Sequence, residues 1–120
     1  MTRYRLSHTA VADIDAILLR SGRHFGEPAR RRYAALIAAG IRDVAKNPSG
    51  ADTRSRPELG DGVRSYHLRQ SRAHTTGGAV HEPRHFLIYR VDAGDVVIGR
   101  VLHESMDLER HIDSASTWES

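Results

Sequence analysis

Three arginines fall in segments whose alternating pattern predicts β-strands, and they are the first residues that could do chemistry. They are Arg64, Arg90 and Arg100. Guanidinium groups on a sheet face could line a groove that binds phosphate, because each offers a planar fork of donors. The commoner role is structural, in which the arginine bridges to Asp or Glu at the sheet edge or lies exposed with its stem packed. The structural role is the favoured interpretation.

His103 follows the last predicted strand and is the best candidate for an acid or base, since an imidazole titrates near neutral pH. His103, Asp107 and His111 are spaced four residues apart, so one continuous helix could turn them toward a common metal ion. Continuous helix through 103–111 is not expected. A His–Asp hydrogen bond that holds the C-terminal region is therefore the favoured role.

Four further histidines cluster near the middle of the chain. They are His67, His74, His81 and His85. Zinc binding there is conceivable, but the spacing is loose, Pro83 interrupts it, and the sequence has no cysteine. Phosphate-binding loops, dinucleotide-binding glycine patterns and Ser/His/Asp arrangements are also absent from the sequence. We expect no metal, no cofactor and no small-molecule ligand.

The length and composition predict a single globular domain. The chain has 120 residues, of which 39% are hydrophobic and 28% charged, and a domain of this size can bury a core without disulfides. The lack of cysteine excludes disulfide frameworks, thiolate metal sites and cysteine nucleophiles. No apolar run is long enough to span a membrane, and no secretory signal is recognisable. We therefore expect a cytoplasmic protein.

Charge is distributed unevenly along the chain. The first 90 residues carry 16 basic and 8 acidic side chains, a net charge of +8, whereas the last 30 carry 2 basic and 7 acidic ones, a net of −5. A basic body suggests an anionic partner, either nucleic acid or an acidic protein. The run Arg30-Arg31-Arg32 could touch either partner, although most such runs are simply solvated.

The elements that must position these residues can be read from the periodicity. A short strand at 4–6 precedes Ser7, a good N-cap, and apolar residues then repeat at helical spacing over 8–24 and again over 28–46. Period-two segments follow at 63–69, 85–91 and 96–102, with a tight turn at 92–95. The remaining segments are predicted as an irregular loop at 47–62, a long hairpin loop at 70–84, a short helix at 106–112 and a polar C-terminal tail at 113–120.

This order of elements predicts an α+β fold. An N-terminal strand is followed by an antiparallel helical hairpin, which packs on an antiparallel sheet of three to four strands. Residues 1–112 form the domain.

Residues 4–112 resemble the RelE/ParE superfamily of bacterial toxins, and most closely ParE. The matching pieces are Tyr4-Arg5-Leu6-Ser7, Phe25-Gly26, Asn47-Pro48, Gly62-Val63-Arg64, Ile88-Tyr89-Arg90-Val91 and Arg100-Val101-Leu102-His103 with Met106-Asp107. The last piece is the most diagnostic. One departure is the 70–84 segment, which is longer than the hairpin usual in that superfamily.

The resemblance implies the toxin of a type II toxin–antitoxin pair, neutralised by a ParD-like antitoxin and acting on DNA gyrase by binding rather than catalysis. Two alternatives stay open. A RelE-like ribosome-dependent mRNA endoribonuclease would use Arg64, Arg90 and His103, since RNA cleavage needs a base, an acid and cations for the phosphorane. A non-toxic remnant would only bind the antitoxin. A single plausible acid–base histidine and the acidic C-terminal stretch favour the binding toxin.

Overall fold

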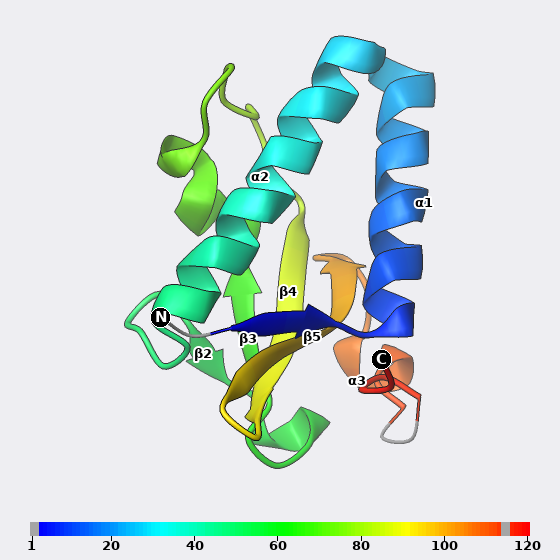
Figure 1. Cartoon of the computed structure of the whole chain (residues 1–120). Helices are drawn as coiled ribbons and strands as arrows, with labels where there is room; N and C mark the ends of the chain where they lie inside the picture. The colour runs from blue at the N-terminus through cyan, green and yellow to red at the C-terminus, as the bar shows by residue number, and fades with distance from the viewer. Residues whose placement is uncertain (1–2, 114–115) are drawn as a thin grey trace.

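The computed structural model describes residues 3–113 and 116–120 and has the expected α+β class (Figure 1). The strands are β1 (Tyr4–Leu6), β2 (Arg54–Ser55), β3 (Arg64–His67), β4 (His85–Asp92) and β5 (Asp95–His103). The helices are α1 (His8–Phe25), α2 (Glu27–Lys46) and α3 (Leu108–His111), with 3-10 helices at Pro57–Leu59 and Leu68–His74. Among the described residues, no helix is both long and apolar enough to cross a membrane.

Helices α1 and α2 form the predicted antiparallel hairpin, which lies over one face of the sheet (Figure 1). Helix α1 begins at Ser7, whose hydroxyl accepts a hydrogen bond from the backbone N–H of Ala10, the capping interaction that the sequence predicts. Gly26 ends α1 with a φ of 88°, in the left-handed region that glycine adopts most easily. Helix α2 starts at once, with Pro28 in its first turn.

The sheet has five strands in the order β1-β5-β4-β3-β2 and is mixed rather than wholly antiparallel. Strand β1 pairs in parallel with β5, where Leu6 lies opposite Ile98. The sheet therefore contains more strands than the three or four expected. The additional strand, β2, lies within the predicted irregular loop and has only two residues, too few to show an alternating pattern.

The two long strands β4 and β5 form the centre of the sheet and carry an irregularity in their pairing. Ile88 lies opposite Arg100 and Tyr89 opposite Ile98, so that Gly99 has no partner residue in β4. A Cβ atom at Gly99 would lie 2.6 Å from the ring of Trp118. Only glycine allows this close approach of the indole to the strand.

Apolar side chains are buried on both faces of the sheet. Toward the helices, Leu36, Val44, Leu87 and Tyr89 belong to the larger cluster. On the opposite face, a smaller cluster forms around Ile88, Leu102 and Val63; Leu108, Ile112 and Trp118 pack against it. The face remote from the helices is therefore covered by α3 and the segments around it.

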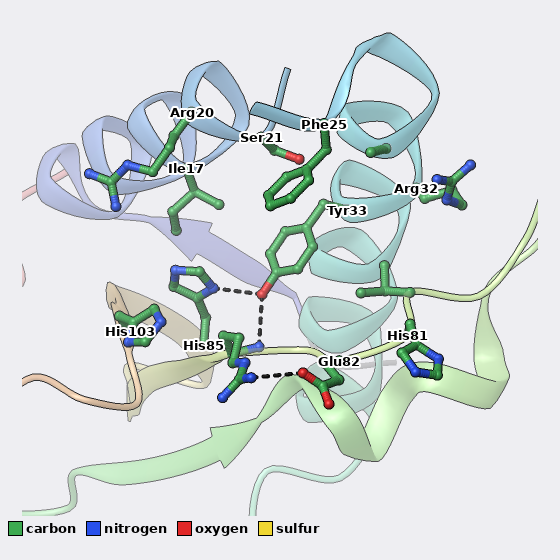
Figure 2. Close-up of a pocket in the computed structure, with 13 residues that line it drawn as sticks. Ile17, Arg20, Ser21, Phe25, Arg32, Tyr33, His81, Glu82, His85 and His103 are labelled. Atoms are coloured by element: carbon green, nitrogen blue, oxygen red, sulfur yellow. Dashed lines mark hydrogen bonds and ion pairs between the residues drawn. The ribbon is translucent and has the colours of Figure 1, made fainter. Parts of the chain in front are cut away.

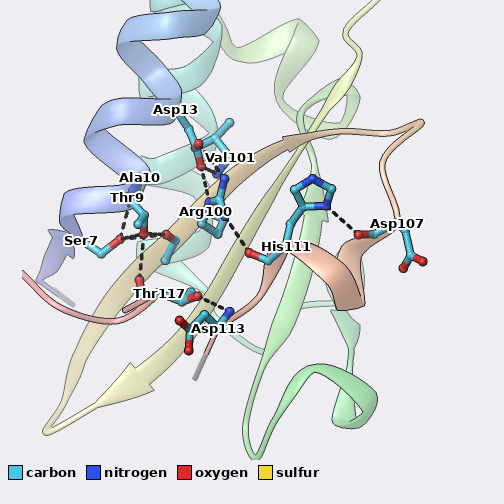
Figure 3. A network of polar contacts seen from close by, with 11 residues as sticks. Ser7, Thr9, Ala10, Asp13, Arg100, Val101, Asp107, His111, Asp113 and Thr117 are labelled. Carbon is cyan, nitrogen blue, oxygen red and sulfur yellow. Dashed lines mark hydrogen bonds and ion pairs between the residues drawn. The ribbon is translucent and has the colours of Figure 1, made fainter. Parts of the chain in front are cut away.

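The segment 113–120, predicted as a polar tail, packs against the body of the domain over its described residues (Figure 3). Thr117 is buried, and its carbonyl accepts a hydrogen bond from the hydroxyl of Thr9. The backbone N–H of His8 donates to the carbonyl of Glu119 at 2.7 Å. The composition of the segment predicts a polar tail but contains no signal for these backbone contacts.

Part of the predicted loop at 70–84 is also more ordered than expected. Its first residues belong to the 3-10 helix Leu68–His74, which packs on α2. Ser71 is buried and donates to the carboxylate of Asp43 at 2.6 Å, and His74 contacts the same carboxylate at 2.7 Å. Burial alone would raise the pKa of Asp43, but these two hydrogen bonds outweigh it and lower the pKa. The irregular part is restricted to the residues after His74.

Candidate functional site

A cleft of about 730 Å³ opens between the tips of α1 and α2, the segment 80–85 and the end of β5 (Figure 2). We call it the hairpin cleft. Its volume is in the range of sites that hold ligands. The residues that line it are Ile17, Arg20, Ser21, Phe25, Ala29, Arg32, Tyr33, Val80, His81, Glu82, Arg84, His85 and His103.

The apolar wall of the hairpin cleft includes an unusually exposed aromatic ring. Phe25 is the last residue of α1 and is 77% exposed, whereas Ile17, Tyr33 and Val80 pack against the larger core cluster. The exposed face of this ring is available for stacking by a partner at the edge of the cleft.

Tyr33 and His85 join α2 to the start of β4 at the base of the cleft (Figure 2). The hydroxyl oxygen of Tyr33 lies 2.6 Å from Nδ1 of His85, and it accepts a hydrogen bond from the backbone N–H of Arg84 at 3.1 Å. Burial, with a smaller effect from the nearby His103 and Arg20, lowers the pKa of His85 to about 4. Burial raises the pKa of Tyr33. Both side chains are therefore neutral at pH 7.

His103 lies directly opposite His85 in the pairing of β4 with β5, which explains why the two rings meet. Their centroids are 5.2 Å apart in an edge-to-face arrangement. Nδ1 of His103 accepts a hydrogen bond from the backbone N–H of Ser105 at 3.0 Å. The neutral imidazole therefore carries its proton on Nε2.

A second depression of about 520 Å³ adjoins the hairpin cleft, and we call it the arginine hollow. His81, Glu82 and Arg84 line both. The other residues that line the hollow are His67, Arg69, Gln70, Arg72, Pro83 and Glu104. Burial, aided by the charge of Arg69, lowers the pKa of His67 despite the opposing effect of Glu104.

The structure does not bring Arg64, Arg90 and His103 to one site. Arg64 lies opposite Tyr89 in the sheet, and Arg90 is the next residue along β4, so their side chains lie on opposite faces. His103 pairs with His85, which lies four residues along β4 from Tyr89, the partner of Arg64, a separation of about 13 Å at 3.3 Å per residue. The catalytic role of this trio therefore stays a prediction, without a common site to support it.

Arg64, Arg90 and Arg100 each have a structural partner. Arg64 donates to the hydroxyl of Thr53 at 2.9 Å, and the guanidinium of Arg90 lies 4.6 Å from the centroid of the Trp118 ring. Arg100 forms a two-pronged ion pair with Asp13, at 2.7 and 3.0 Å. For Arg100 the structural role favoured from the sequence is confirmed.

The other histidines are held singly. His74 contacts Asp43, and Nδ1 of His111 lies 2.8 Å from the carbonyl oxygen of Asp107. Within residues 3–113 and 116–120, no group of three or more His, Asp or Glu side chains is placed to hold a metal ion.

Sequence reasoning missed the residues that surround His103 in the cleft. Tyr33 and Arg20 come from helices whose periodicity marks them only as core or surface, and Arg84 from a segment without periodicity. The density of histidines between 67 and 85 was the available signal. This clustering suggests metal binding from the sequence, whereas in the structure two of these histidines, His81 and His85, line the hairpin cleft.

The family comparison matches the model of the "ParE toxin of type II toxin-antitoxin system, parDE" over residues 4–108. A chain of the chromosomal ParDE TA system from P. aeruginosa has a similar structure, with a TM-score of 0.63 and 18% sequence identity. The similarity covers 86% of this chain and 96% of that one, and at this identity it shows the fold. No curated protein matches the sequence significantly.

Proposed function

The chain belongs to the ParE toxin family of type II toxin–antitoxin systems, and on that premise we propose that it inhibits DNA gyrase by binding. In the cytoplasm a ParD-like antitoxin would hold it inactive. The matching family and the fold supply the toxin assignment. The target and the identity of the antitoxin are the parts that the proposal adds.

The observation that carries the binding mode is the separation of Arg64, Arg90 and His103. Cleavage of RNA requires a base, an acid and cations around one phosphate. Here the two arginines lie on opposite faces of the sheet, and Trp118 stacks on Arg90. A toxin without an assembled group of this kind acts by occupying a surface of its target.

The antitoxin is expected to complement the charge of the toxin. The first 90 residues carry a net charge of +8, which favours an acidic, amphipathic segment that wraps the helical hairpin and an edge of the sheet. A neutralising contact of this kind should bury more than roughly 1,200 Å². Ready dissociation of the purified pair at submicromolar concentration would contradict this expectation.

The decisive experiment expresses the wild-type chain and three variants, each checked for folding by circular dichroism. The variants are Arg64→Ala, Arg90→Ala and His103→Gln, with Arg54→Ala as a matched control because Arg54 is exposed on the edge strand β2. We expect all of them to arrest growth. The wild type should block supercoiling by purified gyrase and produce no codon-specific cuts in mRNA.

Two other results would replace the proposal. If folded His103→Gln loses toxicity by ~100-fold or more and the wild type cuts mRNA at the ribosome, the chain is an endoribonuclease. If the wild type binds its antitoxin but neither arrests growth nor affects gyrase or mRNA, it is a remnant that only binds the antitoxin.

A further inference from the structure

The hairpin cleft and the arginine hollow lie next to each other, because His81, Glu82 and Arg84 line both, and we call the two together the basic depression. Among the described residues that line it, five are arginines and two are glutamates, a net charge of +3 with the histidines neutral. The arginines are Arg20, Arg32, Arg69, Arg72 and Arg84.

The positive charge of this depression is largely unneutralised. The guanidinium groups of Arg20, Arg32 and Arg69 make no hydrogen bond or ion pair with any residue that the structure describes. Arg72 uses only Nε, which donates to the carbonyl of Val80 at 2.8 Å. The glutamates are already engaged: Glu82 is bound by Arg84 at 2.7 Å, and Glu104 lies 3.5 Å from Arg84 and from His67.

One buried donor in the arginine hollow has only a long contact with an acceptor. His67 is 5% exposed, and its Nδ1 accepts the backbone N–H of Arg69 at 3.1 Å, so the neutral ring carries its proton on Nε2. This Nε2 is buried and makes no hydrogen bond, and its contact with a carboxylate oxygen of Glu104 is long, at 3.5 Å. A buried donor without a good hydrogen bond costs stability. A ligand oxygen in the hollow could supply a shorter hydrogen bond.

Aromatic and apolar surface is confined to one end of the depression. Phe25 and Tyr33 line the hairpin cleft, where Figure 2 shows Arg20 and His103 on one side of Tyr33 and Arg32 on the other. In the arginine hollow, Pro83 is the only apolar lining residue among those described. An amphipathic peptide would find apolar contacts in the hairpin cleft but only Pro83 in the arginine hollow, whereas a chain of phosphates with an occasional stacked base would fit both parts.

We propose that this depression binds a single-stranded nucleic acid. The phosphates lie against Arg20, Arg32, Arg69 and Arg72, and one base stacks on the exposed ring of Phe25. Basic grooves with aromatic platforms bind single strands in this way, with little preference for sequence. The site includes His103 but neither Arg64 nor Arg90, and the proposal involves no cleavage. It does not depend on the proposed inhibition of gyrase.

The test measures fluorescence anisotropy of labelled 12-nucleotide single strands, one of DNA and one of RNA, with the purified full-length chain. A duplex of the same sequence is the comparison. We expect the single strands to bind more tightly than the duplex and the affinity to fall as salt rises, with a log–log slope of about −0.7 for each phosphate contacted. If one of the two single strands binds more tightly, that strand identifies whether the site takes DNA or RNA.

Matched variants distinguish the contacts with phosphates from the stacking of a base. Arg20→Gln and Arg69→Gln should each reduce the magnitude of the salt slope by about 0.7. Phe25→Ser should lower the affinity by roughly 5- to 100-fold and leave the slope unchanged, because it removes stacking and not charge. Arg54→Gln, on the edge strand β2 and outside the lining of both depressions, should change neither.

The proposal is overturned if the single strands do not bind, if the duplex binds as tightly, or if Arg54→Gln weakens binding as much as Arg20→Gln. Tighter binding of an acidic peptide such as oligo-glutamate, with displacement of the strand, would assign the depression to a protein partner instead. The gyrase assay is independent of these results, so failure here is distinguishable from failure of the proposed function.

Discussion

Charged side chains at the two ends of helix α1 differ in whether they are paired. At the first end, Asp13 accepts hydrogen bonds from the guanidinium of Arg100 and the backbone N–H of Val101, and Arg100 also reaches the carbonyl of His111 (Figure 3). At the other end, Arg20 has no hydrogen-bond partner among the described residues, and Phe25 is mostly exposed.

The difference separates charges that hold the fold together from charges that are available to a partner. Asp13 and Arg100 are only 16% and 20% exposed, and each would be costly to leave unpaired. Arg20 is exposed and contributes little to stability without a partner. Changes at the first end should therefore affect folding, and changes at the second should affect binding.

The strongest test of this comparison is Asp13→Ala. It leaves the partly buried guanidinium of Arg100 and the N–H of Val101 without their acceptor, so the free energy of unfolding should fall by about 3–5 kcal/mol. Urea unfolding followed by circular dichroism measures the change. Asp15→Ala, an exposed aspartate on the same helix, is the control and should change it by less than about 0.5 kcal/mol. A decrease of less than 1 kcal/mol in the free energy of unfolding of Asp13→Ala would contradict the stabilising role assigned to this ion pair.

The next largest effect is a dependence of stability on pH that originates at His85. Because its pKa falls from 6.5 to about 4 on folding, the unfolded chain binds a proton between these values and the folded one does not. Stability should therefore fall as the pH decreases from about 6.5 to 4, by up to about 3 kcal/mol, and this contribution should be constant below pH 4.

The variant that tests this origin is His85→Phe. Urea unfolding at several pH values should show a shallower pH dependence for His85→Phe than for the wild type, even if the variant is less stable overall. His24→Gln is the control, because His24 is exposed at the end of α1. An unchanged slope in His85→Phe would assign the acid sensitivity to His67 or to the carboxylates instead.

A smaller effect is expected from Gly99→Ala, which concerns the first end of α1. The new methyl group would meet the ring of Trp118 and the side chain of Thr117 at 2.6–2.7 Å, so the segment must shift at a cost of about 1–3 kcal/mol. Trp118 is the only tryptophan, and its fluorescence reports the displacement directly. Gly22→Ala, within α1, should be neutral or stabilising. Unchanged fluorescence and stability in Gly99→Ala would show that the packing at Gly99 is loose.

The smallest effect should come from Arg20→Gln, at the second end. Because this guanidinium has no partner in the described structure, the free energy of unfolding should change by less than about 0.5 kcal/mol. Thermal unfolding is sufficient for the measurement. A loss above 1 kcal/mol would mean that the exposed charges of the cleft also serve the fold.

The sequence was sufficient to predict the elements whose signals are local. Helices α1 and α2 follow from apolar residues at spacings of three and four, Ser7 from its position before the first helical turn, and the turn at 92–95 from its composition. These features depend on neighbours within one or two turns, so a single sequence contains all the necessary information.

What the sequence did not predict depends on residues far apart in the chain. The parallel pairing of Leu6 with Ile98 and the contact of Tyr33 with His85 join segments that no periodicity relates. The docking of Trp118 requires a glycine on a strand, which was not recognised as a contact position. Residue types indicated that histidines and arginines were present, and only the topology shows which of them meet.

The parallel pairing of β1 with β5 has a consequence for the synthesis of this protein. Residues 4–6 leave the ribosome early, but their neighbours at 96–98 are added more than ninety residues later. Since β5 is also the partner of β4, neither the sheet nor the cleft at the end of β5 exists on most partly made chains. Folding must wait for these distant contacts, which also slows it. A nascent chain of this protein therefore lacks both the completed sheet and the cleft until nearly the whole domain has emerged.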